Sequence, residues 1–246
     1  MIRGTIALPV FNSVKIAWLA MESFCNQLRP IDNWELIIFE EKLPNCLDKE
    51  FYFSYENRLK DVGCENITYL TAFEKIPLSM KWVKISYAVN PTSEYFCLCA
   101  VDNYYSPFML RDAEKNVPPA DWFLVNQGYF YDFNLRKLIR YQFGGNIGLQ
   151  MTARTSLVQK MPLEIKNRAV DGWFYSRLHP GRIVKDPSDH WKQTLCTNGL
   201  NNISKSRHTF FTRIRKPFYS CDVTLDQIVP GDIYNRLLAL SESLKK

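Results

Sequence analysis

Acidic residues stand at the ends of two apolar segments in the first half of the chain. Glu40 and Glu41 end the run that begins at Trp34, and Asp102 ends the run 94–102. A third apolar segment, 5–11, ends on Phe11. Carboxylates bind hard divalent cations and accept hydrogen bonds strongly from N–H and O–H groups. Because the carboxyl ends of parallel strands share one edge of a sheet, we expect a ligand cleft there.

Alternating strands and helices must position these residues. The short apolar runs 5–11, 34–41, 67–71 and 94–102 predict strands, because strands buried on both faces are apolar throughout. A helix is expected after Asn12 or Ser13, either of which can cap it, and should end near Pro30. Further helices are expected near 55–62 and 80–89. This order predicts an α/β fold with a mixed, mostly parallel central sheet flanked by helices.

The second half of the chain has a less regular pattern. Residues 121–143 alternate as in two strands of a meander, with a turn near 132–134. The glycines from Gly144 lack a following GK[ST] or GxGxxG, so they predict a turn that leads into a helix ending at Pro162. Helices are also expected at 170–178, with Asp171 near the start, and at the C-terminus, where Asp232 can act as a cap. We expect a single domain over 1–246.

Composition and charge exclude several classes of protein. The 246 residues are 46% hydrophobic, but no segment approaches the roughly 18 apolar residues of a membrane span, so a cytoplasmic protein is expected. Seven cysteines without a CxxC pair predict free thiols. The net charge of +6 favours phosphate-bearing ligands or peripheral contact with an anionic membrane. The basic segment 205–216 is interpreted first as a solvated face, and no nucleic-acid partner is expected.

Four segments, in this order, resemble the inverting family-2 glycosyltransferases of GT-A fold. They are LPVFN followed by WLAMESFCNQ, then WELIIFEEK, then EYFCLCAVDNYYSP at the family's DXD region, and VDGWFYSRL where the family has its catalytic base. The similarity covers about the first 110 residues well and 144–178 moderately. It implies a Rossmann-like GT-A domain, with a nucleotide-binding half at 1–110 and an acceptor-binding half at 111–246.

The resemblance implies a role for several residues of the nucleotide-binding half. These roles belong to residues at strand ends and on one helix. Pro9, Val10 and Phe11 would line the base, Glu40 or Glu41 would accept a hydrogen bond from base or ribose, and Lys81 would lie near the diphosphate. The ordinary alternatives are surface acids for the two glutamates and a surface lysine for Lys81.

A divalent metal, Mn²⁺ or Mg²⁺, is the implied cofactor. Asp102 would bind it where it bridges the two phosphates, although a structural turn acid is the alternative. A histidine from the C-terminal half would add a ligand; His190 is our candidate, with His208 left open.

Asp171 is the implied general base, which would take the proton of an acceptor hydroxyl and so give inversion. Helix capping is its alternative. Trp173, Phe174 and Tyr175 could stack on a sugar ring or belong to the core. The implied function is transfer of a hexose from a nucleotide-sugar, UDP-sugar by family frequency, to a glycan, lipid-linked or protein-linked acceptor. The chain departs from the family in having Glu-Glu for Asp-Asp, one aspartate in the DXD region and no QxxRW. A GT-A-like domain that binds nucleotide or glycan without turnover is therefore the alternative.

Overall fold

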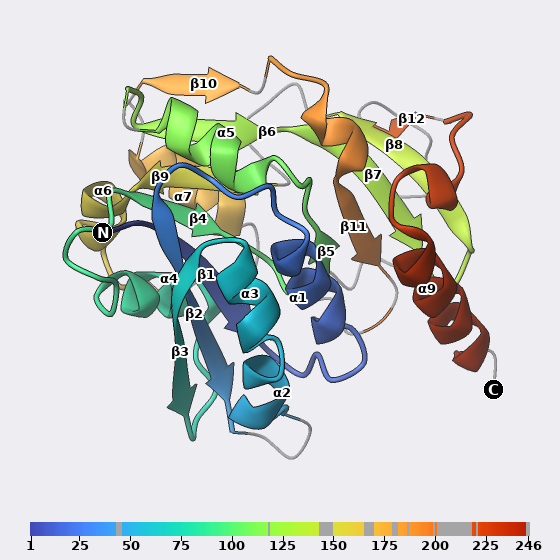
Figure 1. The fold of residues 1–246 in the computed structure, drawn as a ribbon, viewed down its shortest axis with the longest axis horizontal. Helices are drawn as coiled ribbons and strands as arrows, with labels where there is room; N and C mark the ends of the chain where they lie inside the picture. The colour runs from blue at the N-terminus through green and yellow to red at the C-terminus, as the bar shows by residue number, and fades with distance from the viewer. Residues whose placement is uncertain are drawn as a thin grey trace.

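A mostly parallel sheet forms the centre of the molecule (Figure 1). The computed structural model describes residues 1–42, 46–117, 119–142, 150–164, 170–178, 182–185, 187–198, 200, 218–219 and 221–244. Within these ranges the sheet has seven strands in the order β10-β6-β9-β4-β1-β2-β3. β9 is antiparallel to both of its neighbours, and the other pairs are parallel. The strands are β1 (Ile2–Val10), β2 (Asn33–Glu41), β3 (Cys64–Ala72), β4 (Tyr95–Leu98), β6 (Trp122–Val125), β9 (Gln150–Arg154) and β10 (Ile183–Lys185).

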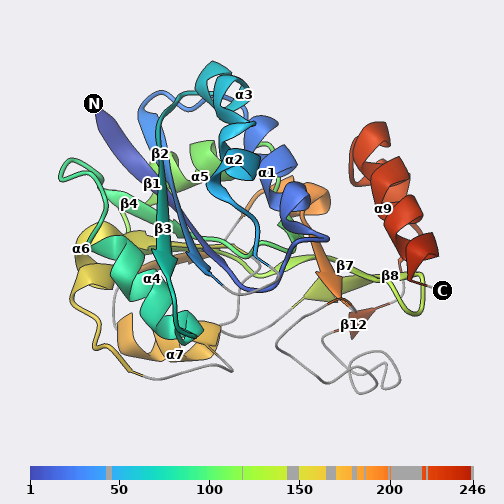
Figure 2. The same ribbon diagram turned by 90° about the horizontal axis from the view of Figure 1, so that it is seen from below.

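Helices cover both faces of this sheet because successive side chains of a strand point to opposite sides. In β1, Ile6 and Leu8 join one buried cluster, whereas Ala7 between them joins the other. The helices α1, α2, α3 and α5 lie on the first face, and α4, α6 and α7 on the second (Figure 2). Their bounds are α1 (Ala17–Cys25), α2 (Lys49–Phe53), α3 (Glu56–Asp61), α4 (Leu78–Ser86), α5 (Met109–Asn116), α6 (Thr155–Gln159) and α7 (Val170–Leu178).

A second, smaller sheet is formed by strands between Asn103 and Tyr219. Its order is β12-β8-β7-β11-β5 among the described residues. α9 (Gly231–Ser243) packs back onto α1 through Arg236, which contacts the Glu22 carboxylate at 3.0 Å and lies 3.9 Å from the Trp18 ring centroid. Strand and 3-10 helix bounds are β5 (Asn103–Tyr104), β7 (Gln127–Asp132), β8 (Lys137–Gln142), β11 (Leu195–Asn198), β12 (Phe218–Tyr219), η1 (His190–Gln193) and η2 (Leu225–Gln227).

The predicted α/β class and the mostly parallel central sheet are confirmed, and β1, β2, β3 and α4 form close to their predicted ranges. The prediction of a helix in the segment after Gly144 is wrong for the middle of that segment. β9 forms where helix was expected, because Gln150–Arg154 is buried between β4 and β6 and pairs with both. Residues 121–143 hold three strands rather than two. β6 joins the central sheet, and β7 and β8 form the predicted hairpin.

The predicted helix caps are wrong as well. Asn12 adopts a left-handed backbone with φ 47°, and α1 begins only at Ala17. The Ser13 side chain donates to the Phe11 carbonyl, while its own carbonyl accepts from the main chains of Ile16 and Ala17. At α9 the N-cap is Pro230, and Asp232 lies in the first turn, where its charge favours the helix dipole without a capping bond.

Two composition-based expectations can be compared with the structure. All seven cysteines are free thiols, as predicted. None of the helices in the described part of the chain is long and apolar enough to cross a membrane. The basic segment 205–216 lies outside the described residues.

Candidate functional site

The carboxyl ends of β1 and β4 meet where the strand order of the sheet reverses. From β1 the chain proceeds outward to β2 and β3, and then returns to place β4 on the other side of β1. Ala7 and Leu98 are the last register pair of β1 and β4. Phe11 and Asp102 each lie four residues beyond that pair along the chain. Open α/β sheets bind ligands at such a switch point, so these two segments define the candidate site.

The end of β1 tolerates a proline because β4 has already ended. The Ala7 carbonyl accepts from the main chain of Cys99, so Ala7 directs its main-chain groups toward β4, and Pro9 two residues later does the same. No ladder bond is lost by the missing N–H of Pro9, since β4 ends at Leu98. Pro9 and Val10 are buried, and Phe11 is half-buried at the mouth of the switch point.

A buried ion pair joins the ends of β1 and β2. The Lys81 ammonium of α4 donates to the Glu41 carboxylate at 2.6 Å and to the Val10 carbonyl at 2.7 Å. The second oxygen of Glu41 accepts from the main-chain N–H of Ile76 at 3.1 Å. Lys81 and Glu41 are each only 2% exposed, which rules out the surface alternatives for both. Burial lowers the pKa of Lys81, and the Glu41 carboxylate offsets part of that shift.

Glu40 points to the other face of β2 and has its own set of donors. One oxygen accepts from the Leu47 main chain at 3.0 Å. The other accepts from the Tyr69 hydroxyl at 2.9 Å and the Tyr52 hydroxyl at 3.4 Å. Burial raises the pKa of Glu40, and these hydrogen bonds oppose the shift. The hydrogen bonds of Glu40 and Glu41 therefore hold the neighbouring loops in place. A nucleotide base that bound to either carboxylate would have to compete with these internal donors.

Two lysines approach the Phe11 ring at the mouth of the site. The ammonium of Lys75 lies 5.2 Å from the ring centroid and that of Lys81 lies 5.5 Å from it. Lys75 is exposed, in contrast to Lys81, so it can contact an anionic ligand. The sequence analysis missed Lys75, because its place beside Phe11 depends on the loop between β3 and α4.

Asp102 lies in the turn that leads from the central sheet into the second sheet. Its main-chain carbonyl accepts from the Thr197 main-chain N–H at 3.1 Å and from the Thr197 hydroxyl at 2.8 Å. Asp102 is half-buried, and the next residue, Asn103, begins β5. Thr197 is a second residue that sequence reasoning missed, since no pattern links positions 95 apart in the chain.

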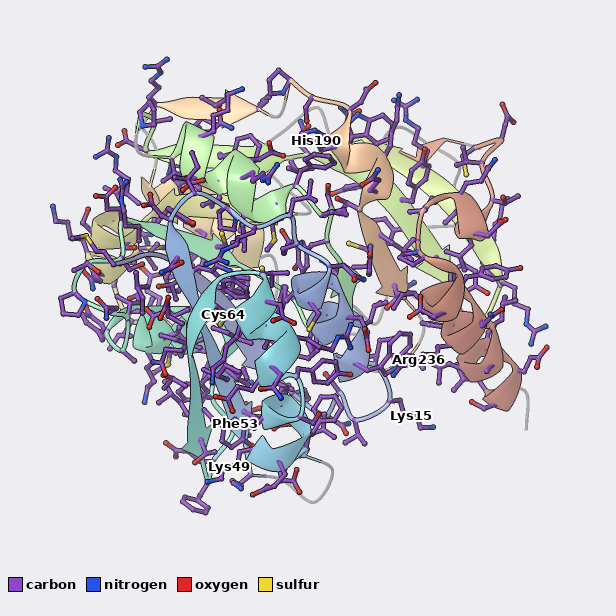
Figure 3. All side chains as sticks on the ribbon, in the orientation of Figure 1. Lys15, Lys49, Phe53, Cys64, His190 and Arg236 are labelled. Atoms are coloured by element: carbon purple, nitrogen blue, oxygen red, sulfur yellow. The ribbon has the colours of Figure 1, made fainter. Side chains whose placement is uncertain are left out.

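His190 contacts α5 and the segment before it. Its Nδ1 lies 2.7 Å from the Asp112 carboxylate, and its ring stacks on Phe108 at 3.8 Å between centroids. Figure 3 shows His190 at the top of the view, whereas Lys49 and Phe53 of α2, beside the carboxyl ends of β2 and β3, are at the bottom. A metal-binding role for His190 stays a prediction. His208 lies outside the described residues.

Asp171 lies in the first turn of α7, as predicted, but its side chain is outside the described part. α7 packs on α4, where the Phe174 ring meets Trp82 edge-on at 5.1 Å. Trp173 and Phe174 are 8% and 0% exposed, so they belong to the core and not to a sugar-stacking surface. The side chain of Tyr175 is likewise outside the described part.

The resemblance implies a divalent metal, for which Asp102 is the predicted carboxylate ligand. Among the described residues there is no group of three or more His, Cys, Asp or Glu side chains that could hold an ion. Mg²⁺-type ions bound to nucleotides use one or two carboxylates together with phosphate oxygens. A single carboxylate, such as that of Asp102, would therefore be sufficient.

A cavity of about 460 Å³ lies elsewhere, between the β7–β8 hairpin, η2 and α9. Its lining includes Tyr131, Arg136, Asp226 and Tyr234, but none of the predicted site residues. The cavity is therefore separate from the predicted site.

The fold is GT-A-like and resembles that of solved glycosyltransferases. Two solved structures illustrate the likeness. S. aureus TarS 1–349 in complex with UDP-GlcNAc superposes with a TM-score of 0.64 at 15% identity, over 83% of this chain and 61% of that one. The mannosyltransferase PcManGT from Pyrobaculum calidifontis, in complex with GDP-Man and Mn²⁺, gives 0.58 at 12% identity, over 84% and 59%. The chain thus spans about three fifths of the length of each of these two solved chains. No family model and no curated protein matches the sequence.

Proposed function

We propose that this protein is a glycosyltransferase that moves a sugar from a nucleotide-sugar, with a UDP-sugar as first choice, to a hydroxyl of a glycan, lipid-linked or protein-linked acceptor. The observation that carries the proposal is the parallel pairing of β1 and β4 at the switch point of a GT-A-like sheet, with Phe11 and Asp102 in the segments that follow these two strands. The structural neighbours hold UDP-GlcNAc and GDP-Man, which supports a nucleotide-sugar as donor.

Each residue of the site would have its own role in the reaction. Phe11, with Pro9 and Val10, forms the base side of the site, and Lys75 offers an exposed ammonium for phosphate. Asp102 would hold Mn²⁺ or Mg²⁺, which when bound neutralises charge on the departing nucleoside diphosphate. Asp171 would accept the proton of the acceptor hydroxyl as its oxygen attacks the anomeric carbon from the face opposite the diphosphate, which gives inversion.

A thermal-shift panel of UDP-GlcNAc, GDP-Man and a dTDP-sugar, each with and without Mn²⁺, tests the donor. Ligands that bind only the folded state raise its melting temperature, so one nucleotide-sugar should stabilise the protein in a metal-dependent manner. Folded protein that responds to none of them would contradict the proposal.

Binding without turnover is the second candidate, because the segment at the family's DXD region has one aspartate, Asp102. Hydrolysis of the stabilising nucleotide-sugar distinguishes the two. For an enzyme, Asp102→Asn should remove the metal dependence, and Asp171→Asn should lose transfer while still binding nucleotide. Equal turnover in wild type and both variants would refute both assignments, and no turnover in wild type with intact binding would favour the second candidate.

A further inference from the structure

Asp102 lies in a turn and is held in place by hydrogen bonds from another strand. β4 ends at Leu98 and β5 begins at Asn103, so Asp102 lies between two short strands of different sheets. Upstream, the Tyr105 hydroxyl accepts from the main chain of Ala100 and from the Asn103 side chain. The carbonyl of Asp102 itself is fixed by both donors of Thr197.

The β5–β11 ladder explains why Thr197 reaches this carbonyl. The antiparallel register pairs Leu195 with Tyr104 and Cys196 with Asn103. The next pair in that register is Thr197 with Asp102, where the ladder continues as one main-chain bond plus the hydroxyl bond.

Thr197 is itself held rigidly from its other side. It pairs with Tyr131 of β7 and is 2% exposed. The next residue, Asn198, donates from its side chain to the buried Asp132 carboxylate at 3.0 Å. β11 is therefore fixed in the interior of the second sheet, and Thr197 links that sheet to the turn of Asp102.

We infer that Thr197 is a positioning residue, whose hydroxyl sets the orientation of the Asp102 peptide and thereby the affinity of the site for metal-bound diphosphate. The inference rests on the proposed function. Two donors on one carbonyl fix the direction of the peptide plane, and the carboxylate departs from the adjoining Cα. Sites for metals and phosphates tolerate displacements of only about 0.5 Å, so loosening the peptide weakens binding without removing the ligand.

Thr197→Val and Thr194→Val form a matched pair of variants. Both exchange a buried hydroxyl for a methyl group of the same shape, three positions apart in the chain. Thr194 is 1% exposed, and its hydroxyl has no hydrogen-bond partner in the described structure. The Thr197 hydroxyl, in contrast, donates to the Asp102 carbonyl. Thr197→Ser retains the hydroxyl and serves as the conservative rescue.

The readout is binding of Mn²⁺ to the protein saturated with UDP, followed by the electron paramagnetic resonance signal of free Mn²⁺. Loss of one neutral hydrogen bond corresponds to an affinity loss of about twofold to tenfold. We expect this loss in Thr197→Val, near wild-type affinity in Thr197→Ser and Thr194→Val, and unchanged UDP binding without metal in all three. If Thr197→Val does not fold, Thr197→Ala replaces it.

The outcomes separate the two proposals. Wild-type protein that binds neither UDP nor Mn²⁺ contradicts the proposed function itself. Wild-type protein that binds both, with Thr197→Val binding Mn²⁺ equally well, overturns only the role of Thr197. An equal loss in Thr197→Val and Thr194→Val also overturns it, because the effect would then come from repacking of β11 and not from Asp102.

Discussion

The Glu41–Lys81 pair should dominate the stability of the site, and Lys81→Met tests this. Methionine keeps most of the side-chain volume but removes the charge that lies 2.6 Å from Glu41 and the donor to the Val10 carbonyl. Removing one partner of a buried pair leaves an uncompensated charge and costs about 3–5 kcal/mol. Because the Lys81 and Glu41 side chains are only 3% and 1% exposed, solvent cannot replace the lost partner, and the upper part of this range applies.

Urea unfolding followed by tryptophan fluorescence measures the cost, and Lys84→Met on the exposed side of the same helix is the control. The control should change the free energy of unfolding by less than about 0.5 kcal/mol. Glu41→Gln combined with Lys81→Met should recover about 1–3 kcal/mol relative to Lys81→Met alone, since no unpaired charge remains and the Ile76 hydrogen bond is kept. A loss below about 1 kcal/mol in Lys81→Met, or no recovery in the double variant, would refute the buried-pair reasoning.

Three other predictions concern the fold around the site. A Cβ on Gly4 would overlap the ring of Tyr95, whereas a Cβ on Gly231 meets nothing within 4 Å. Gly4→Ala should therefore destabilise the protein by at least about 1–3 kcal/mol in thermal unfolding, and Gly231→Ala should not destabilise it. Equal melting temperatures of the two variants would contradict this prediction. Burial raises the folded pKa of Glu40 above the ordinary 4.5, so its neutral form favours folding at low pH and that stability is lost as pH rises through the folded pKa. The stability of Glu40→Gln relative to wild type should therefore increase with pH across that window and then level off, and a flat or falling difference would speak against it. Cys46 and Cys221 are the two half-exposed cysteines of the seven, so native protein should react quickly with a thiol reagent at these two only. More than two fast-reacting thiols would be inconsistent with the fold.

Local patterns predicted the elements whose stability is local. The apolar runs of β1 and β2 and the helix α4 could be recognised because each carries its own signal over nine residues. β9 could not, because its five residues become a strand only by pairing with β4 on one side and β6 on the other. A run that short has no period long enough to distinguish strand from helix.

The sequence predicted which strand ends share one edge of the sheet, but it did not predict the contacts of the residues there. Phe11 and Glu41 lie next to or at the ends of β1 and β2, as predicted, because topology alone brings carboxyl ends to one edge. The predicted strand 94–102 is too long, since β4 ends at Leu98 and Asp102 lies in the turn that follows. The partners that hold them could not be predicted, because Lys81 lies 40 positions from Glu41 and Thr197 lies 95 from Asp102. Such pairs are created by packing, and a single sequence carries no signal for them.

A crystal of the protein grown with UDP and Mn²⁺ tests the central claim most directly, through the anomalous scattering of manganese. The account predicts UDP at the switch point between β1 and β4, with its base beside Phe11 and a manganese peak coordinated by the Asp102 carboxylate and the diphosphate. A nucleotide bound at another surface, or manganese bound without Asp102, would contradict it.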